Sequence, residues 1–197
     1  MELMDAIGRR RTVRDYADRD VPFSVIQKAL RAALLAPSYN HQKEWYFVLV
    51  RDPNVRRALV TAENAPDSLP EGSEDGFEGY EPLAKEMYLT AIPRQKKMIL
   101  TAPALLVVVY KPKTPIAESK QIVDSNCLAA VWCCIQNMLL SLAEDDVYAT
   151  TMVPPDTDAV KKALGIPREL EVAATIPMGY MARDARIIPP KEVAVES

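Results

Sequence analysis

The sequence predicts a single domain in which helices and strands are mixed without regular alternation. Its 197 residues, of which 49% are hydrophobic and 26% charged, have the composition of a globular protein with one sizeable core. The chain has only six glycines, and no Gly-rich phosphate-binding loop follows any of its predicted strands. A doubly wound nucleotide-binding fold is therefore not expected.

The first third of the chain contains a helix, a strand and a second helix. Residues 23–36 carry an apolar stripe at helical spacing, and Pro37 ends this helix. The stripe consists of Val25, Ile26, Ala29, Leu30, Ala33 and Leu34. Residues 45–50 (WYFVLV) are aromatic and β-branched, which predicts a strand. Residues 52–63 form a helix with Asp52 as N-cap and Pro53 in the first turn.

The remaining elements follow in irregular order. Residues 104–110 (ALLVVVY) are apolar on both faces and predict a central strand. Residues 124–143 predict a helix with almost no polar face, which we expect to be buried nearly all round as the spine of the core or of a subunit interface. A strand at 147–152, a helix at 157–165, a strand at 172–180 and a Pro-containing tail at 181–197 complete the chain.

An acidic segment at about residues 63–81 interrupts this pattern. No Lys or Arg occurs from Ala58 to Ala84, and the stretch holds three glycines and three prolines. Its acidic residues are Glu63, Asp67, Glu71, Glu74, Asp75, Glu78 and Glu81. Both a lid and a disordered, solvating loop are consistent with this composition.

Positive charge is concentrated near the N-terminus of a chain whose formal charge is −3. Arg9, Arg10, Arg11 and Arg14 lie within six positions of each other. A general nucleic-acid-binding protein has an excess of basic charge, so these arginines are expected to bind a small anion, unless they are only a solvated helix end.

Most other kinds of site have little support. The three cysteines (Cys127, Cys133 and Cys134) have no nearby histidine, and we expect reduced structural thiols with no metal. His41 is the only histidine, and no serine has a nucleophile-elbow context. Chemistry is therefore expected from a bound cofactor. No signal peptide or membrane span is expected, which favours a cytoplasmic protein.

Five segments in order resemble the FMN-dependent nitroreductase family. They are RRRTVRDY, LLAPSYNHQKEWYFVLVRD, TAPALLVVVYKP, QNMLLSLAEDDVYATTMVP and LGIP with IPMGY, and the resemblance runs from Met1 to about Val193. It implies an α+β fold over residues 1–197, with a mostly antiparallel central sheet flanked by helices. It also implies a homodimer that binds FMN at the subunit interface.

The resemblance assigns roles to the arginine segment. Arg10, Arg11 and Thr12 are expected to hold the phosphate and ribityl end of FMN, because guanidinium groups bind phosphate bidentately and a hydroxyl adds one hydrogen bond. Arg14 is expected at the pyrimidine edge of the flavin, where a cation stabilises the negative charge of the reduced ring.

The second segment resembles the turn whose serine approaches the cofactor in this family. Pro37, Ser38 and Asn40 are the cofactor-contacting candidates here, and Gln42 keeps the family spacing. The single proline that is usual in the family is replaced by Lys43 and Glu44, so the loop lacks the ring that would restrict its backbone. We expect Trp45 to be a core residue rather than a flavin-stacking one.

The last candidates come from the end of the predicted strand at 147–152 and from the tail. Thr150 or Thr151 is expected to contact the flavin N5 through a backbone N–H or a hydroxyl. The resemblance also places a basic residue after the GY pair against the phosphate, and Arg186 fits this better than Lys191.

The resemblance implies an FMN-dependent oxidoreductase that transfers hydride from NAD(P)H to a small electron-poor acceptor, nitroaromatic or quinone-like. Two alternatives stay open: a specialised branch, such as reductive dehalogenation or flavin-consuming chemistry, and a flavin-binding or regulatory protein without turnover. The sequence does not choose the substrate, or between NADH and NADPH.

Overall fold

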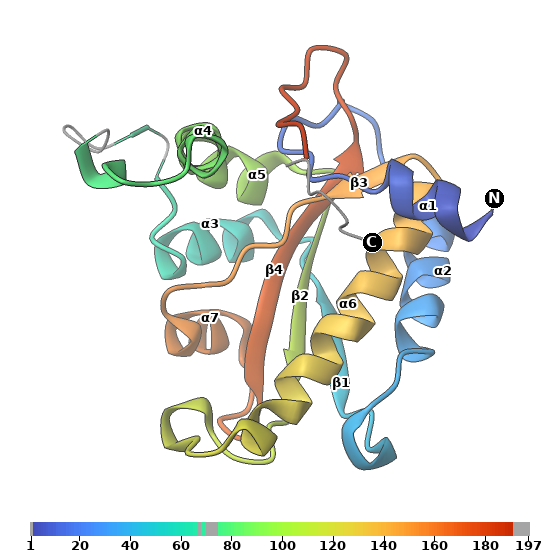
Figure 1. Ribbon diagram of the computed structural model, residues 1–197, viewed down its shortest axis with the longest axis vertical. Coiled ribbons are helices and arrows are strands. Elements are labelled where there is room, and N and C mark those ends of the chain that lie inside the picture. Colours follow the sequence, from blue (N-terminus) through green and yellow to red (C-terminus); the bar gives the residue numbers. More distant parts are fainter. Residues whose placement is uncertain (1, 67, 70–74, 191–197) are drawn as a thin grey trace, which may run out of the picture.

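A four-stranded antiparallel sheet forms the centre of the protein. The computed structural model describes residues 2–66, 68–69 and 75–190. The strands are β1 (Trp45–Leu49), β2 (Ala104–Tyr110), β3 (Val147–Ala149) and β4 (Glu171–Tyr180), in the spatial order β1-β2-β4-β3. Every neighbouring pair is antiparallel, which confirms the expected α+β class (Figure 1).

Helices cover both faces of this sheet. They are α1 (Leu3–Arg9), α2 (Phe23–Leu34), α3 (Pro53–Ala62), α4 (Pro82–Ala91), α5 (Gln95–Thr101), α6 (Asn126–Glu144) and α7 (Thr157–Leu164). α2 and α6 lie on one face, and α3, α5 and α7 on the other (Figure 1).

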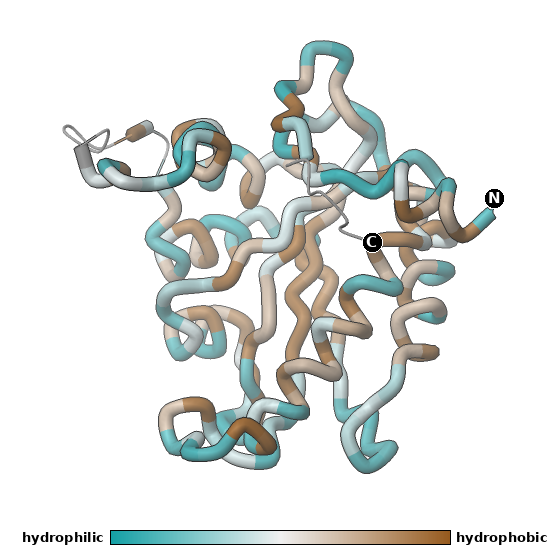
Figure 2. The backbone as a smooth tube through the Cα atoms, in the orientation of Figure 1, coloured by the Kyte–Doolittle hydropathy of each residue, from teal (hydrophilic) through white to brown (hydrophobic). Residues whose placement is uncertain are grey.

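β2 holds these two layers together. All seven of its residues are buried, as expected for a strand that is apolar on both faces. Leu106 and Val108 point into the core shared with α2 and α6, whereas Leu105 and Val107 point into the core shared with α3, α5 and α7. The hydropathy colouring in Figure 2 shows this apolar centre.

Three of the predicted helices form for the reasons that the sequence indicates. In α2, the expected apolar stripe buries Ile26, Ala29 and Ala33, although Leu34 is exposed at the end of the helix. In α3, the Asp52 side chain accepts a hydrogen bond from the Asn54 N–H at 2.7 Å, as an N-cap does. α7 ends at Gly165, whose φ of 65° suits a glycine.

α6 is less buried than the sequence suggests. One side packs on the sheet and on α2 through residues such as Val131, Ile135 and Met138. The opposite side leaves Ala129 and Cys133 exposed and Trp132 half-buried in the single chain. Among the described residues, Ile122–Glu144 are long and apolar enough to cross a membrane by length and composition alone, a property that core helices of soluble proteins share.

The acidic segment leads into helices that the sequence analysis missed. Residues 67 and 70–74 lie outside the described residues, and Asp75–Phe77 form a single 3-10 turn. α4 then begins with a capping hydrogen bond from the Ala84 N–H to the Glu81 side chain. Phe77 and Tyr88 stack with ring centroids 5.3 Å apart, which joins the end of the acidic segment to α4.

Two loops carry backbone conformations that usually favour glycine. Asp146, in the turn before β3, has a φ of 57°, and Asn40, His41 and Lys43 also have positive φ. The loop before β1 is fastened by a hydrogen bond of 2.7 Å from Lys43 Nζ to the Leu34 carbonyl. Trp45 is buried in the core, as expected.

Candidate functional site

The arginine segment crosses the end of the sheet beside β3 and β4. It begins where α1 ends, and Thr12 forms a parallel bridge with Ala149. Tyr16 bridges Met181, directly after β4. The arginines at positions 10, 11 and 14 are therefore placed at one end of the sheet, beside the end of β3.

Two buried hydrogen bonds fix the register of this segment. The Thr150 hydroxyl donates to the Val13 carbonyl at 2.6 Å, and the Tyr16 hydroxyl donates to the Pro177 carbonyl at 2.8 Å. Val13 is fully buried, so its neighbours are held against the sheet. Because backbone groups buried away from water need partners, these bonds make the path of the segment specific.

Arg14 is the most unusual of the arginines. It is only 8% exposed, and its Nε–H is buried without a hydrogen-bond partner among the described residues. Burial lowers the pKa of its guanidinium, although an arginine remains charged at neutral pH. A buried donor of this kind costs about 1–3 kcal/mol if it stays unpaired, so an anionic or carbonyl-bearing ligand would stabilise the site.

Arg14 lies on the walls of two adjoining cavities. The first, of about 520 Å³, is lined by Arg10, Arg11 and Thr12 and by residues 187–190 of the tail. The second, of about 570 Å³, lies between α4 and residues 150–155. Both volumes fall in the range of small-molecule binding sites. Met87 of α4 also borders both cavities.

The structure distinguishes between the two threonines after β3. The Thr150 N–H donates to the Pro177 carbonyl at 3.1 Å and its hydroxyl to Val13, so both groups are engaged. Thr151 lines the second cavity, and within the described part of the chain its N–H has no recorded partner. Thr151 is therefore the better placed of the two to donate a hydrogen bond to a ligand.

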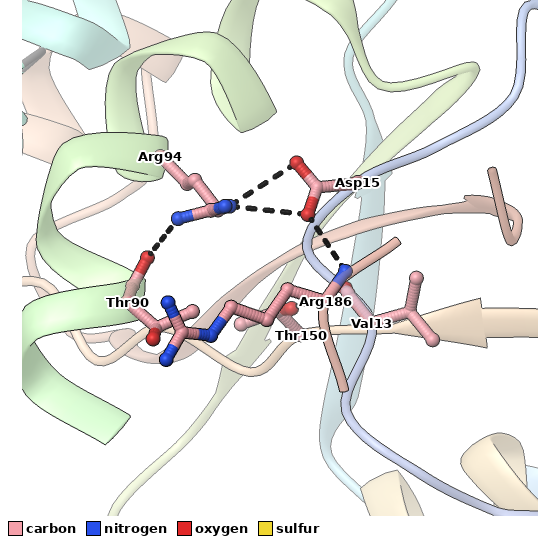
Figure 3. A network of polar contacts seen from close by, with 6 residues as sticks. All are labelled: Val13, Asp15, Thr90, Arg94, Thr150 and Arg186. Atoms are coloured by element: carbon pink, nitrogen blue, oxygen red, sulfur yellow. Dashed lines mark hydrogen bonds and ion pairs between the residues drawn. The ribbon is translucent and has the colours of Figure 1, made fainter. Parts of the chain in front are cut away.

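A polar network ties the arginine segment to the helices beside the cavities (Figure 3). Arg94 Nε lies 3.1 Å from both carboxylate oxygens of Asp15, and another guanidinium nitrogen of Arg94 donates to the Thr90 carbonyl at 2.8 Å. The Arg186 N–H also donates to Asp15, at 3.4 Å. Asp15 thus joins three chain segments at the base of the site.

The Arg186 side chain, expected at the FMN phosphate, binds to α4 instead. Its guanidinium forms an ion pair of 2.8 Å with Glu86 of α4, and both side chains are largely exposed. The tail residues that reach the first cavity are Ile187, Ile188, Pro189 and Pro190. Lys191, the second candidate for a phosphate contact, lies outside the described residues.

The turn at Pro37, Ser38 and Asn40 is not brought to the arginines within one chain. Ser38 borders a separate small cavity with Trp45 and Lys111, and its buried hydroxyl has no hydrogen-bond partner among the described residues. Pro37 and Asn40 are exposed. A role for this turn in cofactor binding stays a prediction that requires a second subunit.

Glu63 is a site residue that the sequence analysis missed, because it was grouped with the acidic segment. It lies at the C-terminus of α3, lines the second cavity and is only 5% exposed. One of its carboxylate oxygens is buried without a hydrogen-bond partner among the described residues. The sequence signal that could have revealed its burial was the alanine-rich, apolar stretch around it.

The other side chains considered have structural positions. Cys127 and Cys134 are buried, Cys133 is exposed, and all three are free thiols. Burial raises the pKa of the Cys134 thiol to about 12, which makes it a poor nucleophile. Over the described ranges, no group of His, Cys, Asp and Glu side chains could hold a metal ion.

Comparisons with known proteins find relatives that cover nearly the whole chain. An iodotyrosine deiodinase from Haliscomenobacter hydrossis is 25% identical over 94% of this chain and 82% of its own length. One from Thermotoga neapolitana is 27% identical over 98% of this chain and 96% of its own length. A crystal structure of oxidised iodotyrosine deiodinase bound to FMN and 3-iodo-L-tyrosine is similar with a TM-score of 0.76 and 24% identity, covering 99% of this chain and 98% of that one.

A family model places the chain more directly. The model of the Nitroreductase family matches residues 7–180, which include the arginine segment, all four strands and both cavity walls at Arg14 and Thr151. The expected order of motifs and the antiparallel sheet are explained by this match. The chain therefore belongs to the Nitroreductase family.

Proposed function

We propose that this protein is an FMN-dependent oxidoreductase that reduces a small aromatic acceptor. The Nitroreductase family is FMN-dependent, and FMN is the cofactor of this chain. The observation that carries the proposal is the position of Arg14, a buried arginine whose side chain forms part of the wall of both cavities. One cavity suits the cofactor and the other the acceptor.

The side chains of the first cavity fit the cofactor. Arg10, Arg11 and Thr12 supply cationic and hydroxyl donors for a phosphate, and Arg14 supplies a cation for the pyrimidine edge of the flavin. When bound, FMN supplies the two-electron chemistry. Arg14 favours the reduced state of the ring, because its charge offsets the negative charge that reduction adds.

The second cavity fits a flat, largely apolar acceptor. Met87, Tyr88, Met98 and Met152 provide thioether and aromatic contacts on its wall. Such groups favour aromatic rings through dispersion and sulfur–ring contacts. Thr151 also lines this cavity, and we expect its N–H to donate a hydrogen bond to the flavin N5.

Reductive dehalogenation of an aromatic is the acceptor chemistry that the relatives favour. The iodotyrosine deiodinases match nearly the whole of this chain. The reaction consumes two electrons and one proton, replaces the carbon–halogen bond by a carbon–hydrogen bond and releases halide. Hydride transfer from NAD(P)H to a nitroaromatic or quinone-like acceptor is the second candidate, and membership of the Nitroreductase family supports it.

An anaerobic reoxidation experiment separates these activities. The FMN-loaded protein is reduced chemically and mixed with 3-iodo-L-tyrosine, with nitrobenzene or with a quinone, and recovery of the oxidised flavin absorbance is followed. Recovery with the halogenated compound and release of iodide would support the first candidate. Flavin that no acceptor reoxidises would indicate a binding protein without turnover. Adding NADH or NADPH to the oxidised protein tests the reductant independently.

A homodimer is part of this proposal. The uncovered side of α6 and the exposed Leu3, Met4 and Ile7 of α1 form apolar surface on neighbouring helices. Large apolar faces of this kind are typical of obligate interfaces. The Ser38 turn of one subunit would then be available to the cofactor site of the other. We expect sedimentation to show a dimer at micromolar concentration, and a folded FMN-loaded monomer would contradict this. The cytoplasmic location stays a prediction.

A further inference from the structure

We propose that Glu63 determines which acceptors bind, by donating a hydrogen bond from its protonated carboxyl to an oxygen atom of the aromatic acceptor. The inference rests on the proposed function, because it assumes that the acceptor occupies the cavity of about 570 Å³ between α4 and residues 150–155. It adds a chemical requirement to that cavity: the acceptor carries an oxygen that can accept a hydrogen bond.

The end of α3 directs Glu63 to this cavity. Its N–H donates to the Leu59 carbonyl at 2.8 Å, which completes the last helical turn and leaves the side chain at the helix end. Glu63 is one of the residues that line this cavity, together with Thr151 and Met152, which come from a segment far away in the sequence. A buried acid thus lies in the same small cavity as the proposed hydrogen-bond donor Thr151.

The carboxyl has one polar neighbour among the described residues, the hydroxyl of Thr175 on β4, and both Glu63 Oε1 and this hydroxyl are buried. Burial raises the pKa of the Glu63 carboxyl to about 7, and a hydrogen bond from Thr175 only partly offsets this effect. One hydroxyl supplies at most one hydrogen bond to a carboxyl with two oxygens, so we infer that an acceptor in the cavity is a further partner.

Other charged groups around Glu63 do not replace such a partner. α5 and α7 pack against α3 and carry Lys96, Lys97, Asp158, Lys161 and Lys162. Lys161 is paired with Asp158 and Glu171, and none of these groups affects the pKa of Glu63. Arg14 and the phenol of Tyr88 are the other titratable groups on the cavity wall.

The charge of the cavity determines what Glu63 can bind. Arg14 already places one cation on the wall, so a cationic ligand would be repelled by it. A neutral or anionic ligand suits Arg14, and toward such a ligand a protonated carboxyl acts as a donor. A carbonyl, nitro or phenolic oxygen is an acceptor of the required kind.

Two ligands of nearly equal shape test this requirement. Acetophenone has a carbonyl oxygen, α-methylstyrene has a CH₂ group in its place, and neither titrates. Their binding to the oxidised, FMN-loaded protein is measured by calorimetry between about pH 5.5 and 8.5, on either side of the Glu63 titration. We expect acetophenone to bind about three- to tenfold more weakly at the high end, the usual worth of one hydrogen bond, and α-methylstyrene to show no change.

Variants assign the effect to Glu63. Glu63→Gln keeps an N–H donor at every pH, so acetophenone binding should become independent of pH. Glu63→Leu should reduce the preference for acetophenone over α-methylstyrene to its high-pH wild-type value at every pH. Glu169→Gln, a change at an exposed carboxyl, is the matched control and should behave like the wild type. Infrared difference spectra should show a protonated carboxyl at low pH that is lost in Glu63→Gln.

Each negative result would contradict a different claim. A protein that binds no FMN would contradict the proposed function. FMN-loaded protein whose acetophenone affinity is independent of pH, or whose Glu63→Gln variant keeps the wild-type pH dependence, would overturn only the role of Glu63. Tighter acetophenone binding at high pH would also overturn it, because the ionised carboxylate would then be the binding form.

Discussion

Replacing Glu63 with Gln should stabilise the folded protein at neutral and alkaline pH but not under acidic conditions. In the folded state burial raises the pKa of this carboxyl from 4.5 to about 7, and Glu63 is only 5% exposed. Below pH 4.5 the carboxyl is protonated in both the folded and the unfolded chain, so ionisation carries no cost there. Between these values the folded chain holds a proton that the unfolded chain has released.

The size of the effect follows from the same two values. Folded wild type binds more protons than unfolded wild type between pH 4.5 and 7, so its free energy of unfolding falls as the pH rises through this window. A shift from 4.5 to about 7 corresponds to about 3 kcal/mol, at about 1.4 kcal/mol for each pH unit. Glu63→Gln cannot ionise and should lose none of this stability.

Urea unfolding of both proteins without cofactor, at a series of pH values, measures this difference. All other titratable groups are shared, so the difference between the two unfolding free energies isolates residue 63. We expect the free energy of unfolding of the variant to exceed that of the wild type increasingly from about pH 4.5 upward. The difference should level off above pH 7, at a total on the order of 2–3 kcal/mol. A difference that does not change with pH would show that the carboxyl is solvated or paired in the folded state.

Three further substitutions test the cofactor site and the core. Arg10→Ala should weaken FMN binding by about 1.5–3 kcal/mol, the worth of a hydrogen bond to a charged group, as measured by flavin fluorescence titration; unchanged affinity would remove Arg10 from the phosphate site. Arg14→Ala should lower the midpoint potential of the bound flavin, by about 30 mV for each 1.4 kcal/mol of lost charge stabilisation, and an unaltered potential would contradict its place at the pyrimidine edge. Leu106→Ala, at a fully buried position of β2, should cost about 2–5 kcal/mol of stability in thermal unfolding, whereas a loss below about 1 kcal/mol would argue against a tightly packed central strand.

Much of the secondary structure was readable from local sequence patterns. The N-cap at Asp52, the apolar stripe of α2 and the two-sided apolar strand β2 each depend on residues that are close in the chain. α4 and α5 were missed because the acidic, Gly- and Pro-containing segment before them suggested one long loop. The cap at Glu81 followed by Pro82 was the local signal that would have found α4.

The candidate site could be predicted only in part. The arginine segment was recognisable as an anion-binding feature, because four cations in six positions need an explanation in an acidic chain. The sequence could not predict that Thr150 and Thr151 differ in which of their groups are free to bind a ligand. It depends on hydrogen bonds to Val13 and Pro177, which lie far from both threonines in the sequence.

The sequence by itself determined the family, the elements with strong periodicity and the concentration of positive charge near the N-terminus. Only the tertiary structure decided that Arg14 lines two cavities, that Asp15 links three segments, and that Glu63 is buried and lines the same cavity as Thr151. The physical reason is that periodicity and capping are set by neighbouring residues, whereas the burial and pKa of a side chain are set by whatever distant segments pack around it.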